Sequence, residues 1–69
     1  MKKFTYTGYF GTTFTVQLNG RDWTMRIEPI GDNFEVWGDG GSYGHFTTFG
    51  KAVTFAEKHL VSMLKNNPL

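Results

Sequence analysis

Apolar and polar residues alternate on both sides of an Asn19-Gly20 pair in the first half of the chain. Every second residue there is apolar, namely Phe14, Val16, Leu18, Trp23, Met25 and Ile27. A period of two predicts strands with one apolar face. Asn-Gly supplies the two positive φ angles of a type I′ turn, so the pattern predicts a hairpin of strands 13–18 and 22–30 joined by that turn.

The neighbouring segments predict more strands of the same kind. Residues 3–7 alternate, and the glycines within residues 8–11 predict a turn after them. Pro29 has no amide donor and is expected at a strand end or on an edge. After a turn at 31–32, residues 33–38 predict a strand that places Phe34 and Val36 on the core face.

The next segment is expected to be mostly irregular. Residues 39–44 predict a loop, because three of the six are glycine. Residues 46–49 predict a short strand leading towards the helix.

The last third of the chain has a helical period. From residue 49 to 65, one side collects Ala52, Val53, Phe55, Ala56, His59, Leu60, Met63 and Leu64. Thr47 or Thr48 is expected to cap the start. Asn66 or Asn67 is expected to adopt the left-handed cap, and Pro68 prevents continuation.

These elements predict a single α+β domain over residues 1–69: a small antiparallel sheet of three to five strands with one C-terminal helix packed across one face. The helix is expected to cover the apolar alternation of the strands. Strand alternation then assigns the opposite face a mostly polar set, made of Thr13, Thr15, Gln17, Thr24, Arg26, Glu28, Glu35 and Trp37.

Composition sets limits on stability and location. A chain of 69 residues buries little surface, and its aromatic fraction of 17% compensates for this. There is no cysteine, which fits a reducing compartment. Residues 1–3 look like the start of a signal peptide, but no apolar stretch follows them. A cytoplasmic protein is therefore expected.

Charge argues against two classes of protein. The chain has seven Lys and Arg residues and six Asp and Glu residues, so its formal net charge is +1. Positive and negative residues are interspersed along the sequence. This balance fits neither a general nucleic-acid binder nor a DNA mimic. No apolar run is long enough to span a membrane, so membrane insertion is not expected.

No motif predicts catalysis, a metal or a cofactor. The glycine-rich segment 38–45 lacks the Lys-Ser/Thr pair of a P-loop and the glycine spacing of a dinucleotide site. Asp39, Ser42 and His45 have the residue types of a hydrolytic triad, but one glycine-rich loop is poor scaffolding for it. His45 and His59 show no metal-ligand spacing, and His59 is interpreted as a half-buried core histidine.

Two surfaces are candidates for recognition. Trp37 beside Arg26 on a polar face is typical of a protein-binding hot spot. In the alternative interpretation Tyr9, Phe10 or the loop around Tyr43 folds over Trp37. Lys51, Lys58 and Lys65 recur every seven residues and either contact phosphates or form a solvated helix face. The predicted partner-binding residues are Trp37, Arg26, Tyr43, Arg21, Asp22 and Glu35.

Antiparallel strands followed by one helix, with the run from Phe46 to Ala56 at the junction, resemble the DNA-binding domains of plant AP2 type and of phage integrase arm-binding type. That resemblance implies DNA read from the sheet by Arg26, Trp37 and Arg21. Small size, near-neutral charge and many aromatics also resemble small accessory proteins of phages, including anti-CRISPR inhibitors.

The leading hypothesis is accordingly a non-enzymatic module, encoded by a phage or other mobile element, that binds and blocks a host protein. A DNA-binding module is the alternative. A homodimer formed through the Trp37 face is a further option.

Overall fold

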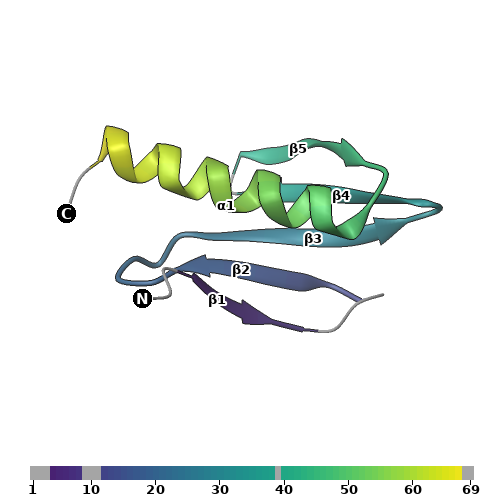
Figure 1. Ribbon diagram of the computed structural model, residues 1–69, viewed down its shortest axis with the longest axis horizontal. Helices are drawn as coiled ribbons and strands as arrows, with labels where there is room; N and C mark the ends of the chain where they lie inside the picture. Colours follow the sequence, from purple (N-terminus) through teal and green to yellow (C-terminus); the bar gives the residue numbers. More distant parts are fainter. Residues whose placement is uncertain (1–3, 9–11, 39, 68–69) are drawn as a thin grey trace.

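The computed structural model describes residues 4–8, 12–38 and 40–67. Five strands form one antiparallel sheet in chain order, and one helix follows them (Figure 1). The elements are β1 (Phe4–Thr7), β2 (Phe14–Leu18), β3 (Thr24–Ile30), β4 (Asn33–Gly38), β5 (Gly41–Phe46) and α1 (Phe49–Asn66). The predicted α+β fold is confirmed. The predicted turn at residues 8–11 and the stop at Pro68 lie outside the described residues except for Gly8.

The hairpin between β2 and β3 forms, but its predicted type I′ turn is wrong. Arg21 N–H donates to the Leu18 carbonyl at 3.1 Å, and Leu18 N–H donates to the Trp23 carbonyl at 3.1 Å, which makes a four-residue loop. Gly20 has a φ of 86°, whereas no described residue other than glycine has a positive φ. Positive φ at the third turn position alone is the mark of a type II turn.

A tight two-residue turn occurs instead between β3 and β4. Ile30 pairs with Asn33, and Gly31 between them has a φ of 58°. Glycine at the first of two central positions is typical of type II′. Pro29 lies one residue from the end of β3, beyond the last paired residue of β2, so its missing amide costs no ladder bond there.

Residues 41–46 form strand β5, so the prediction of a loop over 39–44 is wrong for residues 41–44, and Asp39 lies outside the described residues. The separate short strand predicted over 46–49 is also wrong, because β5 ends at Phe46 and the helix begins at Phe49. The register slips between Val36, which pairs with Gly44, and Trp37, which pairs with Ser42. Tyr43 is therefore an extra residue in a β-bulge.

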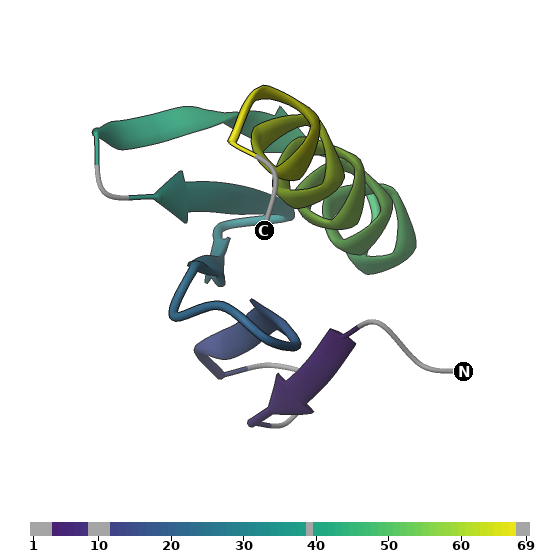
Figure 2. The ribbon, with the colours of Figure 1, turned by 90° about the vertical axis from the view of Figure 1, so that its left-hand side faces the viewer.

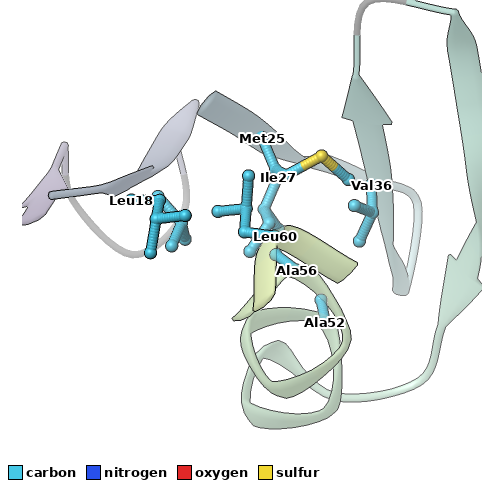
Figure 3. Close-up of a cluster of buried hydrophobic side chains, with 8 residues drawn as sticks. Leu18, Met25, Ile27, Val36, Ala52, Ala56 and Leu60 are labelled. Carbon is cyan, nitrogen blue, oxygen red and sulfur yellow. The ribbon is translucent and has the colours of Figure 1, made fainter. Parts of the chain in front are cut away.

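The core lies between the sheet and α1, on one side of the sheet (Figure 2). Figure 3 shows Ile27 and Val36 pointing from the strands towards the helix, with the Met25 side chain extending towards Val36. The buried side chains of this core are those of Val16, Leu18, Met25, Ile27, Val36, Ala52, Ala56 and Leu60. The two alanines let the helix approach the strands closely. The face that the alternation assigned to the helix is thus confirmed.

The helix ends are defined by hydrogen bonds. Thr48 has an extended backbone, and its hydroxyl accepts from Lys51 N–H at 3.1 Å, which confirms one of the two predicted caps. The left-handed cap predicted at Asn66 or Asn67 is wrong, because Asn67 has a φ of −137° and no described residue other than glycine has a positive φ. The Asn67 N–H instead donates to the carbonyls of Met63 and Leu64. Two carbonyls of the last helical turn are thus hydrogen-bonded without a residue of positive φ.

Candidate functional site

The candidate site lies on the face of the sheet that points away from α1, called here the open face. In the described part of the chain, no element packs against this face. Its side chains are mostly polar, because they alternate with the core residues along each strand, and the apolar exceptions are the Trp37 indole and the exposed Ile30 at the end of β3. The set runs across the strands as Thr5, Thr7, Thr15, Gln17, Thr24, Arg26, Glu28, Ile30, Asn33, Glu35, Trp37, Ser42 and His45.

Trp37 is half-buried on the open face, where strand alternation predicts it. It pairs across the strands with Arg26, whose guanidinium carbon lies 5.9 Å from the centre of the indole ring. A cation at this distance is attracted by the face of the ring. The two side chains therefore form one amphipathic surface.

Glu35 is a buried residue that hydrogen-bonds to this surface. It is only 8% exposed, and it is the sole buried charged residue in the described part of the chain. Its carboxylate accepts from Trp37 Nε1 at 3.0 Å and from the Ser42 hydroxyl at 2.8 Å, and it lies 3.1 Å from His45 Nε2. A buried carboxylate needs such donors. Glu35 was predicted to contact a partner, and in the structure it is buried and hydrogen-bonded to the indole of Trp37.

The bulge in β5 brings two of these donors to one face. Ser42 and His45 are three residues apart, a spacing that alternation alone would send to opposite faces. The extra residue at Tyr43 restores them to the same side, where both reach Glu35. In a serine nucleophile the hydroxyl donates to an imidazole, whereas the Ser42 hydroxyl donates to a carboxylate. Asp39, the third of the residues whose types suit a hydrolytic triad, lies outside the described residues.

Charge on the open face is balanced by neighbours. Glu28 lies directly opposite Glu35 in the β3–β4 register, an arrangement that is unfavourable for two carboxylates. Arg26 Nε lies 3.7 Å from Glu28, and its side chain is 52% exposed. Among the described residues Arg26 is the only arginine or lysine on this face. The surface is therefore close to neutral, with an exposed guanidinium at its centre.

Tyr43 lies on the other side of the sheet from Trp37, so the structure does not bring these two predicted anchors together. As the bulged residue, Tyr43 turns towards the helix, and its ring lies 4.5 Å from that of His59 and 6.3 Å from that of Phe55. It does not cover Trp37, as one alternative proposed. Tyr9 and Phe10, the other residues proposed to cover Trp37, lie outside the described residues.

Arg21 also points towards the helix and away from the open face. Its Nη2 donates to the Asn67 carbonyl at 2.5 Å, and its guanidinium carbon lies 4.4 Å from the centre of the Trp23 ring. A cation here complements the C-terminal end of the helix dipole. Asp22 is exposed in the same loop, beside Gln17 of the open face. Arg21 and Asp22, the predicted hairpin-end anchors, both line a shallow hollow beside Gln17.

The three lysines occupy the back of the helix. Lys51, Lys58 and Lys65 are exposed, and Lys58 is rotated about 200° from the buried Ala56, at about 100° per residue. They therefore lie on the layer opposite to the open face. A ligand bound to the open face therefore does not also contact the three lysines.

No group of three or more His, Asp or Glu residues arranged to hold a metal occurs in the parts of the chain that the structure describes. Within the same residues, no helix has the length and apolar character needed to cross a membrane. His59 is half-buried between Tyr43 and Phe55, as interpreted from its place on the helical period. Comparisons with protein-family models, curated proteins and solved structures found no match to this chain.

Proposed function

We propose that this chain is an interaction module that binds a protein partner through the open face of its sheet and blocks that partner by occupying its surface. The observation that carries the proposal is the Trp37 indole, held on a polar face by Glu35 and flanked by Arg26. Trp and Arg are enriched among residues that dominate protein-binding energy.

Preorganisation supports the role of Trp37 as an anchor. An indole fixed by a 3.0 Å hydrogen bond loses little conformational entropy when it enters a partner's pocket. Arg26 is more than half exposed and donates from a planar group that fits a partner carboxylate or carbonyl. The polar residues around the pair supply a rim that binds water when the face is free.

The test compares capture of proteins from a bacterial lysate by the wild-type chain and by Trp37→Ala. Loss of a central anchor is expected to weaken binding by about 2 kcal/mol or more, close to a thirtyfold change in Kd. Trp37→Ala is expected to stay folded, because the indole lies outside the core beneath α1. A urea unfolding curve for each protein checks this.

Two controls make the result specific. Lys65→Ala changes an exposed residue on the far side of the molecule and is expected to retain the partner. Arg26→Ala is expected to weaken binding while leaving the helix-side core intact. A partner retained by folded Trp37→Ala would contradict the proposal, and so would a wild-type dimer by light scattering that Trp37→Ala converts to monomer.

The location of the protein in the cytoplasm belongs to the same proposal. It is supported by the absence of cysteine, since chains that rely on disulfides belong to oxidising compartments. A host protein is the class of partner that we infer from the small size and aromatic composition of the chain.

A further inference from the structure

A second surface lies on the helix side of the molecule, along the border between β5 and the first half of α1. It is a shallow hollow whose floor consists of Phe46 and Phe55, with ring centres 5.1 Å apart. Gly50 and Thr54 contribute a small, exposed wall. Both phenylalanines are only half-buried, so apolar surface remains accessible here.

Two lysines border this hollow without an anionic partner. Lys51 and Lys58 both line it and are exposed, and no ion pair involves either ammonium within the described residues. Glu57 is the only carboxylate on α1, and it points to the opposite flank, where it accepts a hydrogen bond from Tyr6. The hollow therefore combines an apolar floor with uncompensated positive charge.

The adjoining strand is a free edge of the sheet. β5 is last in the strand order, so among the described strands only β4 pairs with it. A free edge accepts an added strand, whose backbone hydrogen bonds give affinity while alternate side chains give specificity. The bulge at Tyr43 interrupts regular pairing, which leaves Gly44, His45 and Phe46 as the stretch of the edge beside the hollow.

We propose that the hollow binds an extended acidic segment of a protein partner, with one apolar side chain on Phe46 and Phe55 and a carboxylate on each of Lys51 and Lys58. The lysines are about 10.5 Å apart along the helix, at about 1.5 Å per residue. Residues i and i+4 of a strand are about 13 Å apart and point to the same face, as does residue i+2 between them. A partner segment that fits the hollow therefore has the sequence pattern acidic-x-apolar-x-acidic, where x is any residue.

The probe is a displayed library of random peptides, selected on the wild-type chain and counter-selected on Lys51→Glu/Lys58→Glu. Counter-selection removes peptides that bind the Trp37 face, because that face is unchanged in the double variant. The expected result is enrichment of peptides with two acidic residues four positions apart and an aromatic or aliphatic residue midway. A selected peptide is expected to bind the double variant at least tenfold more weakly.

Matched variants distinguish the hollow from the rest of the charged helix surface and from the open face. Lys65→Glu makes the same charge change on the same helix, outside the hollow, and is expected to bind the peptide within twofold of wild type. Trp37→Ala is expected to bind it unchanged, which keeps this result independent of the open-face proposal. Urea unfolding of each variant checks that the fold persists.

Three results of the selection would overturn the inference. They are no enrichment, enrichment of peptides without the acidic pair, and equal binding by the folded double variant. Binding of a short duplex DNA at physiological salt that is weakened alike by substitution of each of the three lysines would assign them to phosphate instead, and would also overturn it.

Discussion

At the scale of single residues, two hydrogen-bonded carboxylates organise opposite sides of the sheet. On the open face Glu35 collects Trp37, Ser42 and His45. On the helix side the Tyr6 hydroxyl donates to Glu57, which ties the edge strand β1 to the helix. Neither link was visible in the sequence, because Tyr6 and Glu57 are 51 residues apart and the partners of Glu35 depend on a bulge.

Tyr6 is expected to make stability depend on pH in the alkaline range. Its hydrogen bond to Glu57, together with burial and the nearby negative charge, raises the pKa of Tyr6 from 10.0 to about 12. The unfolded chain therefore releases this proton first. The stabilisation is complete below about pH 10 and is lost as pH rises towards 12. Urea unfolding of wild type and Tyr6→Phe at about pH 9 and pH 11 measures it.

Comparison of the two proteins isolates Tyr6 from lysines and other tyrosines that titrate in the same range. Wild type is expected to lose more stability than Tyr6→Phe between the two pH values. Equal losses would show that the hydroxyl of Tyr6 is not held by Glu57 in solution.

At the scale of elements, alternation in the sequence was a better guide than turn residues. The hairpin loop has four residues where two were predicted, which shifts the β2–β3 register by two positions. A shift of two leaves every side chain on its predicted face, so the core and Trp37 were placed correctly. β5 was missed because its glycines hide the alternation and its bulge breaks it, which also misplaced Tyr43.

The packing of β4 against the bulged residue of β5 predicts a sharp difference between two glycines. A Cβ at Gly38 would lie 2.5 Å from Cε2 of Tyr43 and 3.2 Å from the Met25 sulfur. Gly38→Ala is therefore expected to destabilise the protein by about 1–3 kcal/mol through overpacking. Gly50→Ala meets no described atom within 4 Å and is expected to stabilise helix α1 by up to about 1 kcal/mol.

Chemical denaturation of both alanine variants against wild type measures the difference. If Gly38→Ala proved as stable as wild type, the Tyr43 ring would not rest on β4 as described. Gly38 has no positive φ, so contact with neighbours is the only source of the expected loss.

At the scale of the whole molecule, the sheet separates two surfaces of different character. The open face is near-neutral and carries Trp37 and Arg26, whereas the back of the helix carries the three lysines. The sequence predicted both surfaces, but it did not show that they lie on opposite layers. Their relative placement depends on the helix covering the other face of the sheet (Figure 2).

This separation predicts how the chain responds to DNA. A duplex on the open face meets one arginine and two glutamates, so binding there is expected to be undetectable at physiological salt. Any binding at low salt is expected to come from the lysines, with a slope of log affinity on log salt no steeper than about −2.7, at about −0.9 for each of three contacts. Electrophoretic mobility shift across a salt series measures it.

The open-face variant gives the deciding comparison for this prediction. Trp37→Ala is expected to leave residual DNA binding unchanged, and substitution of the lysines is expected to abolish it. A steep salt slope that disappears in Trp37→Ala would mean that the sheet reads DNA and that the AP2-type resemblance reflects function.

The surplus residue in β5 makes the length of this ribbon critical. Removing Tyr43 would leave Ser42 and His45 two residues apart, so plain alternation would keep both beside Glu35 and only the ring above Gly38 would be lost. Inserting one amino acid between positions 42 and 45 would instead move His45 out of register with Glu35. Insertion scanning is expected to find this strand intolerant of added residues, whereas the four-residue loop between β2 and β3 accommodates them.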